Sequence, residues 1–141
     1  MERRAALKTA AVLAIAATYA SAYDNSKIVN KMKMKMKDPA NPTGFELTHT
    51  PQITLSALDP KGYITVEVTV GEKGDIHPST MDHWIYKLEL FADGNKVGSV
   101  DLEPVTSRGY LGAKVKYAGL KELRALSYCN LHGIWENTLK V

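Results

Sequence analysis

The chain has 141 residues and a mass of 15.5 kDa, which is the size of about one domain. Its composition, 45% hydrophobic and 23% charged, is that of an ordinary folded domain and excludes a disordered or collagen-like chain. The formal net charge is +3. Because many of the basic residues lie near the N-terminus, this charge does not describe the whole chain evenly.

Residues 1–22 have the three-part layout of an export signal. A basic start is followed by an apolar run over about residues 10–20, which is too short to span a bilayer. The segment ends in Ala20-Ser21-Ala22, which fits the A-x-A pattern of a cleavage site. We therefore expect cleavage after Ala22, a periplasmic location and no stable membrane insertion of the mature chain. The alternative is a buried N-terminal helix.

The basic residues of this segment favour a particular export route. Arg3 and Arg4, followed by Leu7 and Lys8, resemble the twin-arginine signal, although its usual phenylalanine is absent. That route carries folded proteins, often with the cofactor already inserted; an ordinary secretory signal is the alternative. Without residues 1–22, 15 basic and 14 acidic residues remain, a net charge of +1. This balance gives little reason to expect a nucleic-acid partner.

Residues 23–44 are predicted to be a basic arm and linker. Lysines and methionines alternate over residues 31–37, which suits a strand with its methionines on one face. Lysine is a poor strand former, however, and no neighbouring hairpin supplies a partner strand. We therefore expect a solvated arm of net charge +4 over residues 23–37, in front of a domain of net charge −3. A methionine-rich copper site is the alternative, but no His or Cys lies beside the three thioethers.

From residue 45 to the C-terminus the pattern predicts one all-β domain. Short segments with a period of two are separated by turn signals such as Asp59-Pro60-Lys61-Gly62 and Asp93-Gly94. The expected strands are residues 53–58, 63–70, 84–92, 97–102, 111–117, 122–128 and 134–141. No segment shows a helical period. About seven short strands indicate an immunoglobulin-like β-sandwich without the cysteine pair of true immunoglobulin domains.

The single cysteine and the four histidines are the candidate site residues. Because Cys129 is the only cysteine, it forms no disulfide within the chain, and an exported free thiol favours metal binding. All the histidines lie outside the expected strands, where sites are commonly built, although each alone could be a surface imidazole. The set is His49, His77, His83, Cys129 and His132.

The number and type of these donors favour iron or copper. A structural zinc site closes with four ligands, so a fifth protein ligand argues against zinc. Carboxylates are not prominent, which argues against calcium. Five nitrogen and sulfur donors suit an octahedral ion that keeps one position open for a substrate.

The surroundings of these residues resemble the superoxide reductase family, which comprises neelaredoxin and the C-terminal domain of desulfoferrodoxin. The resemblance covers roughly residue 45 to the C-terminus, and its most specific part is the ending Cys-Asn-x-His-Gly-x-Trp. The matching segments are His49-Thr50-Pro51, His77-Pro78 with His83, and Cys129-Asn130-Leu131-His132-Gly133-Ile134-Trp135.

This resemblance implies one mononuclear non-haem iron per chain. The four histidines would be its equatorial ligands, and Cys129 would be the axial thiolate opposite the open position. Superoxide would accept one electron there and leave as hydrogen peroxide, without formation of dioxygen. The resemblance also implies an external electron-donor protein and a homo-oligomer.

Two departures from the family pattern stand out. The family usually has Glu-Lys immediately before the first histidine ligand, but here these positions are Leu47 and Thr48, and Glu46 lies one position too early. Another cation, such as Lys73 or the basic arm, would then attract the superoxide anion. In addition, one cysteine cannot form the four-cysteine iron site that desulfoferrodoxins add.

Two other function classes remain open at this stage. A cupredoxin-like electron-transfer protein would also be a β-sandwich with His and Cys near its C-terminus. It needs an axial methionine after the last histidine, however, and no methionine follows Met81. An immunoglobulin-like binding module with a vestigial site is the third reading, and the missing Glu-Lys pair keeps it in consideration.

Overall fold

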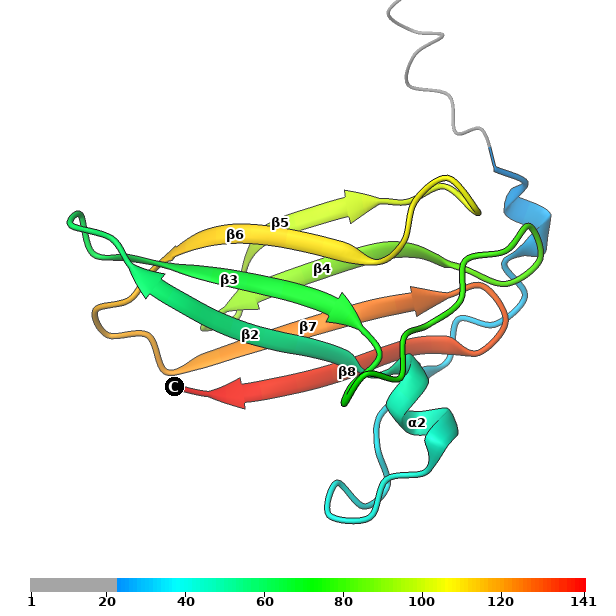
Figure 1. The fold of residues 1–141 in the computed structure, drawn as a ribbon, viewed down its shortest axis with the longest axis horizontal. Helices are drawn as coiled ribbons and strands as arrows, with labels where there is room; N and C mark the ends of the chain where they lie inside the picture. Colours follow the sequence, from blue (N-terminus) through cyan, green and yellow to red (C-terminus); the bar gives the residue numbers. More distant parts are fainter. Residues whose placement is uncertain (1–22) are drawn as a thin grey trace, which may run out of the picture.

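Two β-sheets packed face to face form the body of the molecule. The structure is a computed structural model and describes residues 23–141; the predicted export signal lies outside the described residues. One sheet has the strand order β1-β8-β7-β4-β5 and the other the order β2-β3-β6 (Figure 1). The strands are β1 (Lys33–Met34), β2 (Pro51–Leu58), β3 (Tyr63–Val70), β4 (Ile85–Ala92), β5 (Asn95–Asp101), β6 (Tyr110–Lys116), β7 (Glu122–Cys129) and β8 (Gly133–Lys140). A 3-10 turn, η1 (Asn25–Lys27), and one short helix, α2 (Gly44–His49), complete the elements of the described residues.

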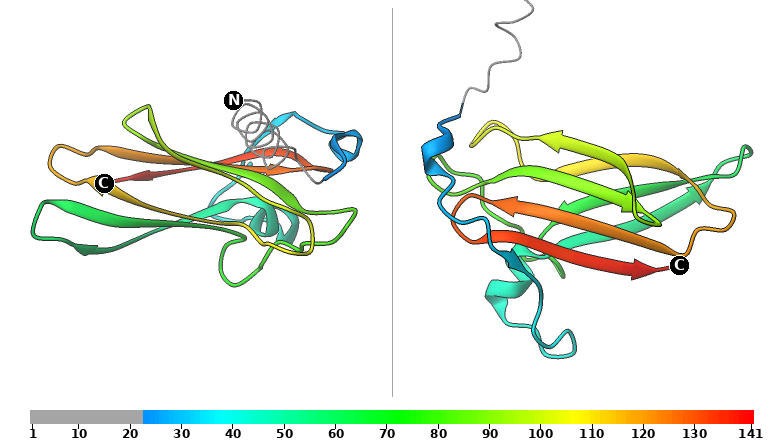
Figure 2. Two further views of the ribbon diagram at one scale, coloured as in Figure 1. Left: turned by 90° about the horizontal axis from the view of Figure 1, so that it is seen from above. Right: turned by 180° about the vertical axis from the view of Figure 1, so that it is seen from behind.

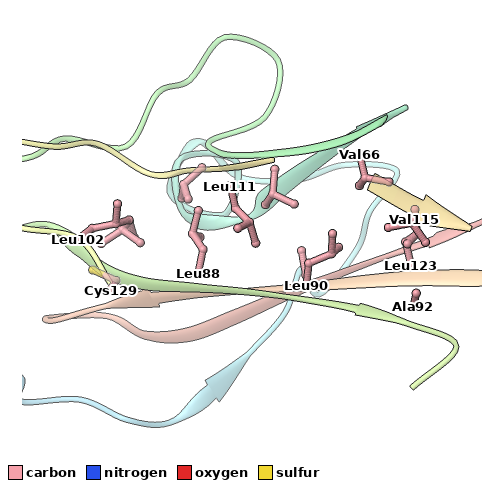
Figure 3. Packing of buried hydrophobic residues seen from close by; sticks show 13 residues of the cluster. Val66, Leu88, Leu90, Ala92, Leu102, Leu111, Val115, Leu123 and Cys129 are labelled. Carbon is pink, nitrogen blue, oxygen red and sulfur yellow. The ribbon is translucent and has the colours of Figure 1, made fainter. Parts of the chain in front are cut away.

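The sandwich forms because alternate residues of the central strands are apolar and face the other sheet. In β7, every second residue from Leu123 to Cys129 is buried, and in β3 the same holds for Val66, Val68 and Val70. These side chains form one continuous core (Figure 3), in which Cys129 lies at one end and Ala92 at the other. The predicted all-β sandwich of about seven strands is therefore confirmed, and each predicted strand boundary is within two residues of the observed one.

The expectation that residues 31–37 form no strand is wrong, although most of their side chains are exposed as expected; we call residues 27–37 the strap. β1 lies within it and pairs in parallel with the start of β8, Lys33 with Ile134 and Met34 with Trp135. Figure 2 shows the strap running beside β8 at the edge of the larger sheet. The partner strand is thus about a hundred residues away in sequence, and a search for a neighbouring hairpin cannot find it.

The helix α2 was also not expected. Its six residues are fewer than two turns, too short to show a helical period. Its sequence signal is instead a capping box, in which the Thr43 side chain accepts from the Glu46 N–H and the Glu46 carboxylate accepts from the Thr43 N–H. The helix ends at His49, directly before β2, and so places this histidine at the end of the sandwich.

Within residues 23–141, no helix has the length and apolar character needed to cross a membrane.

Truncation of a core side chain should lower the free energy of unfolding by a measurable amount. Leu90 in β4 is fully buried, and we expect Leu90→Ala to lower the free energy of unfolding by about 2–5 kcal/mol, because it leaves a cavity between the sheets. Leu58→Ala, at a side chain that is 55% exposed, is the control, with an expected change within about 0.5 kcal/mol. Denaturant titration of both variants checks this, and equal changes would contradict the assigned core.

Candidate metal centre

All five predicted site residues lie at the same end of the sandwich, on three separate segments (Figure 1). His49 is the last residue of α2. His77 and His83 belong to the connection between β3 and β4. Cys129 ends β7, and His132 lies in the tight turn that leads into β8.

The four imidazole rings form a closed square. Neighbouring ring centroids are 4.6–4.9 Å apart, and neighbouring planes are inclined by 76–88°. Across the diagonal, the rings of His49 and His83 are 5.9 Å apart and inclined by only 28°. The order around the square is His49, His77, His83 and His132. Four imidazoles in this arrangement surround a common centre.

The donor atoms of four residues point to this centre. One atom each from His49, His83, Cys129 and His132 lies within 4.8 Å of all the others. The Nε2 of His49 is 3.0 Å from the Nδ1 of His132, and the Cys129 Sγ is 3.6 Å from the same Nδ1. Donor atoms this close are placed for one ion to bind them all.

His77 is not in that group of four, but its Nε2 is also available to bind a metal. Its Nδ1 lies 2.7 Å from the carbonyl oxygen of Pro78, so Nδ1–H donates there and Nε2 is left as the acceptor. The Nε2 atoms of His77 and His83 are both buried and have no hydrogen-bond partner. Buried polar atoms are nearly always satisfied, and a metal ion at the centre of the square would satisfy these two.

His49 is oriented by a neighbour that the sequence analysis did not single out. The carbonyl oxygen of Phe45 lies 2.7 Å from the His49 Nδ1, which leaves Nε2 facing the centre. The centroid of the Phe45 ring lies 4.4 Å from the centroid of the His49 ring and 4.9 Å from that of the His132 ring. In addition, Ser127 Oγ–H donates to the His49 carbonyl oxygen at 2.8 Å and joins α2 to β7. The sequence signal for this contact is the i, i+4 spacing of Phe45 and His49, which places both residues on one face of a capped helix.

The protonation of the site favours a cation. Burial lowers the pKa of His49 to about 4 and that of His77 to about 3, and it also lowers the pKa of His83. The imidazoles of these three residues are therefore neutral near pH 7, which is the form that binds metals. Burial raises the pKa of the Cys129 thiol, against hydrogen bonds from the backbone N–H groups of Leu131 and His132. A bound dication would supply the charge that stabilises a thiolate here.

The side chain of Asn130 joins two of the ligand-bearing segments. It is completely buried, its Nδ2 donates to the carbonyl oxygen of Asp82 at 2.9 Å, and its Oδ1 accepts from the N–H of Trp84 at 2.9 Å. These two residues flank His83, so Asn130 fixes that histidine relative to the adjacent Cys129. On the other side of the turn, Trp135 Nε1–H donates to the carbonyl oxygen of His132 at 3.0 Å.

The residues before His49 do not add a carboxylate or an amine to the centre. The carboxylate of Glu46 accepts from the Lys37 N–H at 2.7 Å and from the Thr43 hydroxyl at 3.0 Å, and the Lys37 bond is the main reason why the pKa of Glu46 is below its usual range. Thr48 Oγ–H donates to the Gly44 carbonyl oxygen at 2.8 Å, and Leu47 accepts from the Glu72 N–H through its carbonyl oxygen at 2.8 Å. Among residues 23–141, the group of converging donors contains no carboxylate.

The lowered histidine pKa values predict how the metal-free protein responds to acid. An unfolded histidine binds its proton near pH 6.5, whereas folded His49 and His77 bind theirs only near pH 4 and 3. The unfolded state therefore binds more protons between these values, and we expect stability to fall as the pH decreases from about 6.5 to about 4. Denaturant titrations at pH 7 and pH 5 after chelation measure this. In His77→Gln the decrease should be smaller, and an unchanged decrease would contradict the assignment.

Comparison with known proteins agrees with this geometry. Residues 41–138 match the family model described as desulfoferrodoxin. The chain is 39% identical over 89 residues to the superoxide reductase of Pyrococcus abyssi, covering 55% of this chain and 75% of that protein. It is 34% identical over 103 residues to the putative superoxide reductase of Methanocaldococcus jannaschii, covering 67% and 82% respectively.

Solved structures show the same likeness. The superoxide reductase (1Fe-SOR) from Giardia intestinalis superposes with a TM-score of 0.57 at 30% identity, covering 67% of this chain and 98% of that chain. The superoxide reductase (neelaredoxin) from Ignicoccus hospitalis superposes with a TM-score of 0.53 at 31% identity, covering 67% and 80%. Because the family model matches residues 41–138, more than half of the chain, the chain belongs to the desulfoferrodoxin family.

Proposed function

We propose that the protein is a superoxide reductase, an oxidoreductase that reduces superoxide to hydrogen peroxide by one electron without forming dioxygen. The observation that carries this conclusion is the convergence of imidazole and thiol donors on one centre, with the buried Nε2 atoms of His77 and His83 unsatisfied. The superoxide reductases among the relatives support the same activity.

The chain's own residues fit one mononuclear iron. His49, His83, Cys129 and His132 would hold it, and we propose His77 as the fifth ligand. Bound iron supplies the transferable electron and an electrophilic position for the superoxide anion. Histidine binds a metal as neutral imidazole, so the single thiolate would leave a divalent centre with a net positive charge. Burial of Cys129 keeps its sulfur from water and from other thiols.

A cation is needed to attract the anionic substrate, because Leu47 and Thr48 supply none. Lys73 and the strap lysines were the candidates from the sequence, and the structure adds Arg108. This arginine lines a cavity of about 490 Å³ that also reaches His77. None of the ion pairs formed by the described residues includes Arg108, so its charge is available to an incoming anion. We therefore propose Arg108 as a substrate-guiding residue.

The remaining parts of the proposal concern the source of electrons, the cellular location and the oligomeric state. The sequence has one cysteine, and the metal centre uses it, so an additional four-cysteine iron site cannot form within it. Electrons would come from an external donor protein. We also propose export to the periplasm, on the basis of residues 1–22, and a homo-oligomer.

The cupredoxin alternative is not favoured by the site. A blue-copper site uses two histidines, one cysteine and a weak axial methionine. Here four imidazoles form one square, two more than a blue-copper site uses. A vestigial binding module is equally disfavoured, because the donor atoms converge and the buried Nε2 atoms of His77 and His83 have no other partner.

Rapid mixing with superoxide tests the proposed activity. The reduced, iron-loaded protein should yield about one hydrogen peroxide per iron, as a one-electron reduction requires, and no oxygen above the spontaneous background. We expect the oxidised, iron-loaded protein to absorb in the red through its thiolate–iron bond. In Cys129→Ser this absorption should disappear and the rate should fall about 100-fold, because the thiolate donor is lost. Circular dichroism controls for folding. Oxygen release, or an unchanged spectrum in the variant, would contradict the proposal.

The role of Arg108 has its own test. We expect Arg108→Gln to lower the second-order rate constant for superoxide by about tenfold at low ionic strength, with a smaller loss at high salt, because salt screens the attraction. Lys61→Gln makes the same change of charge at the opposite end of the sandwich and serves as the control. Equal effects of the two substitutions would show that only net charge matters.

A further inference from the structure

The strap contacts every segment that carries a predicted metal ligand. It consists of Lys27–Lys37 and lies outside residues 41–138, the region matched by the desulfoferrodoxin model. Its contacts reach the turn after β7, the connection before β4 and the helix α2. These three segments hold all five predicted ligands.

Three hydrogen bonds join the strap to the turn between Cys129 and β8 and to the first residues of β8. The Val29 N–H donates to the carbonyl oxygen of Asn130 at 2.9 Å, and the Asn130 Nδ2 donates to the carbonyl oxygen of Lys27 at 3.1 Å. The Ile134 N–H donates to the carbonyl oxygen of Met32 at 2.7 Å. These three hydrogen bonds lie on both sides of His132 in the sequence, at Asn130 and at Ile134.

Gly133 allows the strap to lie directly on this turn. A Cβ atom at position 133 would be 2.5 Å from the carbonyl oxygen of Met32, closer than real Cβ atoms come to an oxygen. The residue also has a φ of 91°, which favours glycine. The glycine next to His132 therefore fits the strap as well as the turn.

The strap also reaches the other two ligand-bearing segments. The Lys27 ammonium donates to the Met81 carbonyl oxygen at 3.1 Å and to the Asp82 carboxylate at 2.9 Å, immediately before His83. At the other end of the strap, the Lys37 N–H donates to the Glu46 carboxylate at 2.7 Å, one helical turn before His49. A hydrogen bond to a carboxylate is among the stronger ones.

We propose that the strap is a positioning element of the metal centre and that its docking is coupled to metal binding. Without a metal, the strap contacts add to the hydrogen bonds of Asn130 and Ser127 in holding the three segments in place. With a metal, the segments are fixed and the strap finds its partners already in position. Coupling of this kind is reciprocal: a strap that favours metal binding is favoured by the metal to the same extent. The inference rests on the metal site of the proposed function but not on its reaction.

Limited proteolysis with trypsin tests the coupling on the full chain. Lys31, Lys33, Lys35 and Lys37 are exposed cleavage sites on the strap, and Lys61 is an exposed site in the β2–β3 turn at the opposite end of the sandwich. We expect anaerobic loading with ferrous iron to slow strap cleavage by about tenfold, within the usual range of coupling between sites. The rate of cleavage after Lys61 should differ by less than about twofold between the iron-loaded and the metal-free chain, because proteolysis reports local opening and this turn is far from the metal site. Mass spectrometry identifies the sites.

The outcomes separate the two proposals. An iron-loaded chain whose strap is cut as fast as that of the metal-free chain overturns the coupling and leaves the metal site standing. A chain that retains no iron overturns the metal site and the coupling together.

A pair of substitutions at one position tests the contact with α2. Lys37→Pro removes the N–H that bonds to Glu46, whereas Lys37→Ala removes the side chain and keeps this N–H. We expect Lys37→Pro to release iron to a chelator about tenfold faster than the parent chain, as loss of one charge-assisted hydrogen bond predicts. Lys37→Ala should stay within about twofold. Equal release from the two variants, with both folded by circular dichroism, would overturn the positioning role of this contact.

Discussion

The side-chain amide of Asn130 is the contact on which the arrangement of the metal centre depends. It has no access to solvent, and it satisfies backbone groups of Lys27, Asp82 and Trp84. These groups belong to parts of the chain that are far apart in sequence. If the amide were lost, three backbone groups would be left without this partner, at a cost of about 1–3 kcal/mol for each one that stays buried and unsatisfied. The distance between Cys129 and His83 is therefore set by hydrogen bonding before any metal binds.

Strands were predictable from sequence where one face is buried and the alternation is strict. β3 was predicted with its observed limits because Val66, Val68 and Val70 alternate with polar residues between clear turns. α2 was missed because six residues cannot show a helical period, although the Thr43–Glu46 capping box was present in the sequence. The pairing of β1 with β8 was missed for another reason. Parallel pairing depends on which distant strand has a free edge, and no local pattern encodes that.

The ligands could be predicted from the sequence because the chain has only four histidines and one cysteine. They come together in the structure because the sandwich brings their loops to one end. The sequence could not give the order of the imidazoles around the square or the roles of Phe45 and Asn130, which depend on tertiary contacts. Glu46 illustrates the difference. The sequence shows only that it lies one position too early for the family's glutamate, whereas the structure shows its carboxylate engaged with Thr43 and Lys37.

The position of β1 also affects how molecules of this protein meet one another. A sheet edge with free N–H and carbonyl groups can accept a strand from a second molecule, which is a common start of aggregation. β1 covers the edge of β8 at Ile134 and Trp135, next to the turn that carries His132. The exposed Lys33 places a charge beside the covered edge, and charged side chains discourage such strand addition. A strand from a second molecule would therefore meet β1 and its exposed lysine there, and not a free edge of β8.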